Sequence, residues 1–476
     1  MPITMSPVSL HIGALRHAVL LLVLASGLPG CSLDNLAGNA QLPPGVPDPR
    51  LTHTPAGALA AYRGALVLLR TAVGSNYGGG ESFVPVTGLL TDELRAGDIG
   101  QIGAMSDNLR LDSRFLPEYA PGSGDDRATL GPIQSVYGLL QQVRGQAREA
   151  RGALGAYDPG GPRALPGHLY AVEGYADILL ADLFCSGIPL STLDFGKDFT
   201  YQPGSSTAEV YQRAVGFFDS ALTVVADSDR ILNLARVGKG RALLALGQYA
   251  AAGTAVAQVP DAFQYALQYS ATSTDTLNAS QNQSFAASAF GGLGNNPLTM
   301  VDVEGGNGLA YLSSGDPRSA WVAEGTNQHG FLLSRPVEYS VAGDGPLVLA
   351  SGVEARLIQA EAALQAGSPG TWLATLNHLR ETAITPAMAD TTDPGTTNGR
   401  VGLMFYERGF WLFLTGHRQG DLRRLIRQYG RQAESVYPTG LYPGAYGSYG
   451  SDVTAPIPGA ERVSNPLFTG CRSRGA

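Results

Sequence analysis

Apolar residues recur at spacings of three and four along most of the chain, with polar residues between them. This is the period of a helix that buries one face, whereas the alternation typical of strands occurs only in a few short runs. The clearest helical patterns cover Leu130–Ala156, Gly167–Phe184, Thr207–Val225, Ile231–Leu246, Tyr249–Val259, Gly352–Gln365, Thr371–Glu381, Gly402–Leu414 and Arg418–Tyr429. The sequence therefore predicts an all-α fold.

Local signals mark the ends of several of these helices. Ser206, with Glu209 three residues later, is typical of a helix N-cap, because each side chain can bond a free backbone N–H of the first turn. Gly247 and Gly367 stand where helix stops are expected.

Two pairs of predicted helices look like hairpins of one type. In the first pair, Gly240 and Ala252 fall where tetratricopeptide repeats place small residues so that two helices can approach closely. The second pair repeats the plan with Ala360 and Ala374. The spacing between the pairs is irregular, so we expect a degenerate array of tetratricopeptide-like hairpins and not a regular solenoid.

Three long segments interrupt the helical patterns: residues 71–125, 261–346 and 436–476. They are rich in Gly, Ser, Asn or Pro and contain scattered aromatic residues. Loops of this length inside a compact domain are usually functional. We therefore expect one helical domain, residues 56–476, that carries these segments as ligand-binding loop insertions.

The N-terminus, residues 1–30, has the layout of a secretory signal peptide, with a short positive region, an apolar run and small or turn-forming residues. Leu28-Pro29-Gly30-Cys31 looks like a bacterial lipobox, although the proline is unusual there, and predicts that Cys31 is lipidated and becomes the first mature residue. The alternative is ordinary cleavage beside a chance cysteine. Residues 31–55 have no hydrophobic period and are expected to form a lipid-anchored tether. No apolar stretch after Cys31 looks long enough for a further transmembrane helix.

The amino-acid composition limits the classes of function that this protein can have. A net charge of −8 disfavours nucleic acid as a partner. The cysteines have no CxxC spacing and the histidines are dispersed, so we expect no metal site and no cofactor. If Cys31 carries lipid, Cys185 and Cys471 are the remaining thiols in an oxidising compartment, and we predict a disulfide between them. Two separate free thiols are the alternative.

The stretch ERGFWLFLTGHRQGDLRRL, which begins at Glu407, concentrates charged residues among aromatic and aliphatic ones. His417 and Asp421 lie four residues apart on one helical face, a spacing that would suit a proton-transfer pair. No substrate cleft or third orienting group is evident in the sequence. Because charges on a mostly apolar helix must be paired when buried, we interpret this stretch as structural. We expect ion pairs between neighbouring helices among Glu407, Arg408, Arg418 and Asp421.

The same stretch carries the strongest motif of a family resemblance. The pattern E-R, E-L, E-G-x-R, D-L-x-R occurs here as Glu407-Arg408, Leu412, Gly416-His417-Arg418, Asp421-Leu422 and Arg424, with Trp411 and Thr415 in place of two glutamates. Further similar motifs are the helix VEARLIQAEA from Val353, the turn Gly315-Asp316-Pro317-Arg318, FCSGIPL from Phe184, and Ala455-Pro456-Ile457-Pro458 with Asn465-Pro466. On these motifs the chain resembles the SusD/RagB family of outer-membrane nutrient-binding lipoproteins, as a divergent member.

The resemblance implies a lipid-anchored protein at the cell surface, in the outer membrane. Such a protein captures a nutrient, an oligosaccharide or in some members a peptide, and hands it to a TonB-dependent SusC-like transporter without breaking a bond. A competing interpretation is an envelope interaction scaffold whose tetratricopeptide-like repeats bind another protein and no small ligand. A lipoprotein hydrolase is a third class, but no catalytic residues are predicted.

Candidate ligand residues lie beside the Gly315–Arg318 turn. Trp321 and Tyr311 flank the turn, and a sugar ring can stack on an aromatic side chain while Arg318 binds its hydroxyls. The alternative is that these aromatic residues fix the loop to the core. Sequence alone leaves both interpretations open.

Overall fold

A computed structural model describes residues 53–75, 81–97, 107–117, 130–270, 283–290, 298–327, 330–443 and 447–476. One compact unit spans Thr54–Ala476. The expected signal peptide (1–30), Cys31 and nearly all of the tether (31–55) lie outside the described residues.

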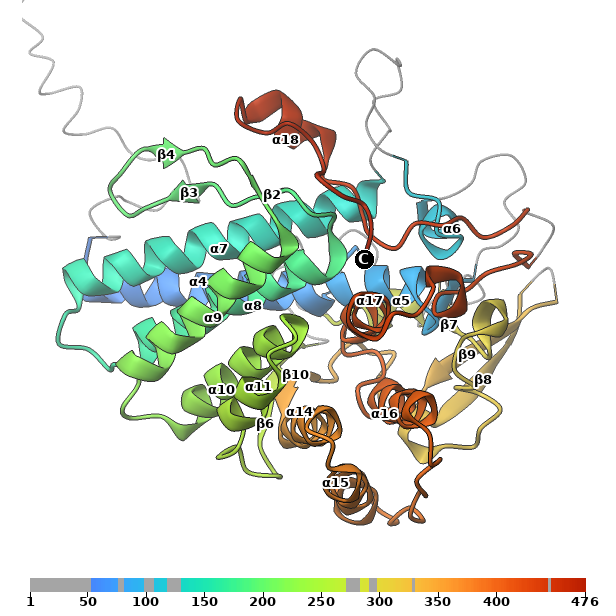
Figure 1. Ribbon diagram of the computed structural model, residues 1–476. Coiled ribbons are helices and arrows are strands. Elements are labelled where there is room, and N and C mark those ends of the chain that lie inside the picture. Colours follow the sequence, from blue (N-terminus) through green and yellow to red (C-terminus); the bar gives the residue numbers. More distant parts are fainter. Residues whose placement is uncertain are drawn as a thin grey trace, which may run out of the picture. The chain divides into compact units, whose positions relative to one another are not determined.

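Helices dominate this unit (Figure 1). The α-helices are α4 (Pro55–Gly74), α5 (Phe83–Leu90), α6 (Asp107–Asp112), α7 (Gly131–Tyr157), α8 (Ala164–Leu183), α9 (Thr207–Val224), α10 (Asp229–Ala245), α11 (Tyr249–Ala255), α13 (Ala286–Ala289), α14 (Gly352–Gln365), α15 (Pro369–Thr382), α16 (Thr397–Trp411), α17 (Arg418–Tyr429) and α18 (Gly459–Ser464). Short 3₁₀ helices are η2 (Glu304–Gly306), η3 (Pro317–Ser319) and η4 (Ala433–Ser435). The predicted all-α fold class is confirmed.

The strands are short and pair only two at a time in the part of the chain that the structure describes. They are β1 (Leu94–Ala96), β2 (Ile188–Pro189), β3 (Thr192–Leu193), β4 (Phe199–Thr200), β5 (Gly204–Ser205), β6 (Gln264–Leu267), β7 (Leu298–Met300), β8 (Trp321–Thr326), β9 (Leu332–Pro336) and β10 (Leu347–Ser351). The antiparallel pairs are β1–β7, β2–β5, β3–β4, β6–β10 and β8–β9. Each pair therefore fastens loops to the helical body.

The first helical hairpin packs as its small residues predict, whereas Ala374 of the second pair is exposed, contrary to the expected plan. At Gly240 in α10, an added Cβ would lie 2.5 Å from Cγ1 of Val256, at the end of α11, so the two helices meet where a larger side chain would not fit. Ala252 and Ala360 are fully buried. The stops at Gly247 and Gly367 both adopt φ +73°, and Ser206 and Glu209 form the expected capping box.

Among the described residues, five α-helices, α4, α5, α6, α13 and α18, lie outside the helical patterns named from the sequence, and two of them change the interpretation. α5 lies inside the 71–125 segment, and each of its residues is buried, so that part of the segment is core and not a ligand-binding loop. α4 is long and apolar enough to cross a membrane by length and composition alone, contrary to the expectation that no such stretch follows Cys31. A core helix passes the same test, and α4 packs along α7 and α8.

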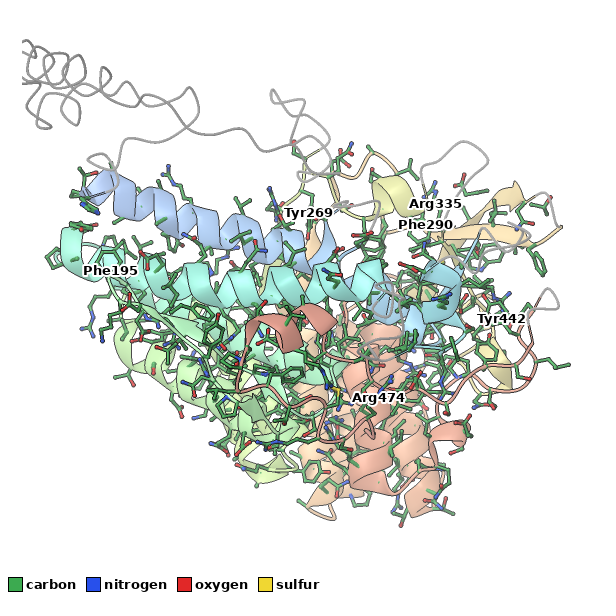
Figure 2. All side chains as sticks on the ribbon, turned by 90° about the horizontal axis from the view of Figure 1, so that it is seen from above. Phe195, Tyr269, Phe290, Arg335, Tyr442 and Arg474 are labelled. Atoms are coloured by element: carbon green, nitrogen blue, oxygen red, sulfur yellow. A yellow bond between two sulfur atoms is a disulfide. The ribbon has the colours of Figure 1, made fainter. Side chains whose placement is uncertain are left out.

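The three predicted loop segments come together at one end of the helical body. β1, from 71–125, pairs with β7, from 261–346, and β7 in turn packs against β9. Tyr442 and Tyr449, from 436–476, pack on Leu109 in α6 and on Phe331. Figure 2 shows Tyr442 and Arg335 at this end, far along α7 from Phe195. The fold thus gathers these loop segments around one surface.

Candidate functional site

α16 and α17 are joined by a buried ion pair. Arg408 donates to both oxygens of Asp421, with an Nε–Oδ2 distance of 2.7 Å and an Nη2–Oδ1 distance of 2.9 Å. One turn further along α17, Arg424 Nη2 binds both oxygens of Glu361 in α14, at 2.8 and 2.7 Å. These bidentate pairs satisfy charges that the apolar surroundings would otherwise penalise.

His417 and Asp421 do not face one another as a proton-transfer pair. The Nδ1 atom of His417 lies 2.8 Å from the Thr415 hydroxyl, and Nε2 lies 3.2 Å from Oε1 of Glu354. Burial would raise the pKa of Asp421, but Arg408 and Arg424 outweigh it and hold this pKa below its ordinary value. Burial and then Arg241 lower the pKa of His417, so its imidazole is neutral at pH 7. The arrangement can fix helices, but it cannot pass a proton from one residue to the other.

Glu407 and Arg418, also in this stretch, form ion pairs with residues outside the neighbouring helices. Glu407 accepts from Arg318 in η3 at 2.5 Å and from Arg380 in α15 at 2.6 Å. Arg418 binds both oxygens of Asp92, which follows α5, at 2.6 and 2.7 Å. The expectation of pairing only between neighbouring helices is therefore too narrow, since these partners come from the loop segments as well.

Tyr311 is not a surface platform, which corrects the expectation that it stacks on a ligand. Its ring is 1% exposed and packs against Phe410 and Phe413, with centroid distances of 5.2 and 4.5 Å. Arg318 is also buried, and its guanidinium is held by Asp316 and Glu407. Neither residue is free to leave these partners for a sugar.

The position of Trp321 is compatible both with stacking on a ligand and with fixing the loop to the core. Its side chain is half-buried at the start of β8, and Nε1 donates to the carbonyl of Leu312 at 3.0 Å. That bond holds the 312 backbone in place beside a cavity of about 160 Å³.

This cavity, which we call the β1–β7–β9 cavity, opens where segments 71–125 and 261–346 meet. It is lined by Arg95, Ala96, Gly97, Thr299, Met300, Val301, Asp302, Leu312, Asn327, Phe331, Leu332 and Leu333. The lining combines an aromatic ring with acidic, amide and guanidinium groups, which is the composition expected of a sugar-binding surface.

The polar groups of the cavity are held in place by the backbone. Oδ1 of Asp302 accepts from the N–H groups of Leu312 and Ser313, both at 3.0 Å, and this leaves Oδ2 to accept a further donor. Asn327 donates to the Gly97 carbonyl at 2.9 Å and accepts from the Phe331 N–H at 3.0 Å, so it fixes one loop segment to another. Side chains oriented in this way lose little entropy when a ligand binds.

Sequence reasoning missed Asp302, Asn327 and Phe331. Asp302 and Asn327 are polar residues in a segment rich in such residues, and no local spacing separates them from their neighbours. Only the pairing of β1 with β7 brings them beside Arg95.

The tail tyrosines fix the C-terminal segment to the body. Tyr442 and Tyr449 are buried, and their hydroxyls donate to Asp112 and Glu304. Tyr437 is also fully buried, and Tyr446 lies outside the described residues. Of these residues, Tyr442 and Tyr449 pack against Phe331 of the cavity lining.

Cys185 and Cys471 form a disulfide that ties the tail to the end of α8. Beside it, Phe184 and Ala455 form an isolated bridge, and so do Ser186 and Ser473. Within the described ranges no group of three or more His, Cys, Asp or Glu side chains is placed to hold a metal ion.

Solved structures of low sequence identity share this fold. Surface glycan-binding protein A from Bacteroides thetaiotaomicron, in complex with laminarihexaose, aligns with a TM-score of 0.63 at 13% identity, covering 88% of this chain and 99% of that one. The corresponding protein from Bacteroides uniformis gives 0.62 at 14% identity, with coverages of 88% and 99%. A SusD-like carbohydrate-binding protein from Bacteroides vulgatus ATCC 8482 gives 0.61 at 15% identity, covering 87% and 97%. No family model and no curated protein sequence matches the chain. The chain has the fold of the SusD superfamily.

Proposed function

We propose that this protein is a nutrient-binding lipoprotein of the SusD/RagB type that captures an oligosaccharide at the cell surface. The observation that carries the proposal is the convergence of segments 71–125 and 261–346 on the β1–β7–β9 cavity, in a fold shared with glycan-binding proteins. The cavity is smaller than the roughly 300–1,000 Å³ of a typical small-molecule site, so we expect it to hold one sugar of a longer chain.

Capture requires no bond to be broken. In this proposal Phe331 stacks on the apolar face of a sugar, and the free Oδ2 of Asp302 accepts from a hydroxyl. The buried charges around α16 and α17 are already engaged with one another, and we assign them a structural role.

Binding can be tested by calorimetric titration with soluble oligosaccharides, beginning with laminarihexaose, and with a parallel set of peptides. Phe331→Ala should weaken binding of the preferred oligosaccharide by about 1–3 kcal/mol, as truncation of an aromatic anchor does. Phe115→Ala is the matched control, because Phe115 is 55% exposed and lies outside the cavity lining. Unchanged binding in Phe331→Ala would exclude this cavity. Binding of peptides alone would replace the sugar with a peptide ligand, and binding of neither would favour the envelope scaffold.

Delivery to a SusC-like TonB-dependent transporter and anchoring in the outer membrane through Cys31 complete the proposal. Co-purification of the two proteins from outer membranes tests the partnership. Cys31→Ala should release the protein from the membrane fraction, and unchanged attachment would exclude lipidation at this residue.

A further inference from the structure

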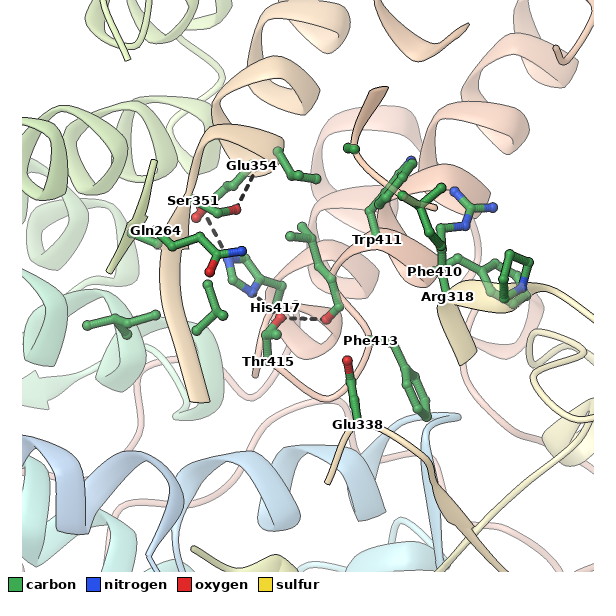
Figure 3. A pocket seen from close by; sticks show the side chains of 18 residues that line it. Gln264, Arg318, Glu338, Ser351, Glu354, Phe410, Trp411, Phe413, Thr415 and His417 are labelled. Atoms are coloured by element: carbon green, nitrogen blue, oxygen red, sulfur yellow. Dashed lines mark hydrogen bonds and ion pairs between the residues drawn. The ribbon is translucent and has the colours of Figure 1, made fainter. Parts of the chain in front are cut away.

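A second cavity, of about 290 Å³, lies between β10, the start of α14 and the turn that joins α16 to α17 (Figure 3). We call it the α14–α16 cavity. It shares no lining residue with the β1–β7–β9 cavity. Its volume is at the lower end of the range for small-molecule sites, so it suits a small molecule and not a polymer chain.

Most of the charges that line this cavity are already neutralised. Arg318 is bound by Asp316 and Glu407. Glu354 accepts from Arg241 through both oxygens, at 2.7 and 2.8 Å. His417 is neutral at pH 7 because burial lowers its pKa. These groups hold the cavity walls together and contribute no free charge to it.

Among the described lining residues, Glu338 is the acidic side chain that has no cationic partner. Figure 3 shows its carboxylate pointing into the cavity, and no cationic side chain in the described part of the chain pairs with it. Its backbone is fixed by the next residue, since the buried Tyr339 donates its hydroxyl to the Leu414 carbonyl at 2.8 Å. Solvent reaches the Glu338 side chain, yet the protein atoms crowded around it raise its pKa to about 7 by disfavouring the charged form. A cation beside this carboxylate would relieve that cost.

Two further side chains complete the cavity. The amide of Gln264, from β6, points into the cavity in Figure 3 and can donate or accept a hydrogen bond. Trp411, at the end of α16, is half-buried and contributes an aromatic wall. A carboxylate, an amide and an aromatic surface together match an ammonium group carried on a small apolar or ring-shaped body.

We propose that the α14–α16 cavity binds a small organic cation, with Glu338 as the counter-ion of its ammonium group. The cavity would then be a second ligand site of the protein, independent of oligosaccharide capture. It discriminates by charge, because a neutral molecule of the same shape can at most donate a hydrogen bond to Glu338 and forms no ion pair with it.

The test uses cyclohexylammonium and cyclohexanol, which share a ring and differ in charge, in titrations of the mature protein followed by NMR or calorimetry. We expect the ammonium to bind at least tenfold more tightly than the alcohol. Glu338→Gln should abolish this difference, and Glu338→Asp should retain part of it. Glu324→Gln is the matched control, since it removes one negative charge from β8, outside the cavity lining.

Equal binding of the two probes, no binding of the ammonium, or an unchanged affinity in Glu338→Gln would each overturn the proposal. Thermal melts of the variants check folding, and the melting temperature should be preserved because Glu338 pairs with no charged side chain among the described residues. A titration with the preferred oligosaccharide in the same variants separates this proposal from the first. Glu338→Gln should leave oligosaccharide binding intact, whatever it does to the ammonium.

Discussion

The guanidinium of Arg408 donates two parallel hydrogen bonds to the carboxylate of Asp421, and both side chains are almost fully buried. The pair joins α16 to α17 at the point where His417 begins the second helix. Bidentate geometry and burial make this contact strong, and removal of one partner leaves the other charged in an apolar environment.

We therefore expect Asp421→Asn to lower the free energy of unfolding by about 3–5 kcal/mol, because Arg408 keeps its charge and loses its counter-ion. Denaturant unfolding measures the change. Asp393→Asn is the matched control, since it removes the partner of Arg400 in a surface pair and should leave the melting temperature nearly unchanged. Equal effects of the two substitutions would contradict a structural role for the buried pair.

The helices of this region could be predicted from the sequence, but most of their charge partners could not. α14 and α17 have the predicted bounds because apolar residues recur at spacings of three and four along each of them. Asp92 lies 326 residues before Arg418, and Glu361 lies 63 before Arg424. No local period encodes such pairings, since they depend on how distant helices pack.

α5 and Tyr311 show two further limits of prediction from the sequence. α5 reads FVPVTGLL, and because it is buried on every side it has no polar face to give a helical period. Tyr311 lies in a polar loop segment, and its composition is equally consistent with a platform and with a core residue. Only the packing of Phe410 and Phe413 against its ring shows that Tyr311 is a core residue. The β1–β7–β9 cavity was unpredictable for the same reason, since strand pairing assembles it from separate loops.

A pH dependence follows from Glu93, whose pKa burial raises to about 8. One oxygen accepts from the Leu414 N–H at 2.8 Å, and the other has no hydrogen-bond partner. The folded protein therefore keeps this carboxyl protonated at pH values at which the unfolded chain has released the proton. The stability that Glu93 contributes is fully present below its unfolded pKa and is lost as the pH rises toward 8.

We expect Glu93→Gln to reduce the fall in unfolding free energy between pH 5 and pH 8, because the amide has no proton to lose in this range. The difference should amount to a few kcal/mol at most, given about 1.4 kcal/mol for each pKa unit. Urea unfolding at both pH values tests the prediction. Asp177, whose pKa is raised to about 6 by burial, remains in the variant and leaves a residual slope. An unchanged slope would show that Glu93 does not hold its proton in the folded state.

The disulfide between Cys185 and Cys471 closes a loop of 286 residues. In the chain-entropy model a link over such a loop stabilises the folded state by about 5–6 kcal/mol, chiefly by restricting the unfolded chain. We expect Cys471→Ser to lower the melting temperature under non-reducing conditions and to remove the effect of reductant on the melt. Peptide mapping after alkylation without reduction checks the bond directly. Recovery of both cysteines in alkylated form would rule it out.

The last prediction concerns the close approach of α10 and α11 at Gly240. A Cβ at this position would meet Cγ1 of Val256 at 2.5 Å and Cδ1 of Ile358 at 3.3 Å, in a region where both neighbours are fully packed. Gly240→Ala should gain about 1 kcal/mol of helix propensity and lose about 1–3 kcal/mol by forcing the helices apart, so the net effect is destabilising.

Gly145→Ala in α7 is the matched control, because nothing lies within 4 Å of the added Cβ. That variant should become more stable by up to about 1 kcal/mol, since only the propensity changes. Thermal and denaturant unfolding of the two variants should therefore give opposite signs. The same sign in both would mean that the hairpin has room for a methyl group at Gly240, and the small-residue interpretation of the tetratricopeptide-like pair would be wrong.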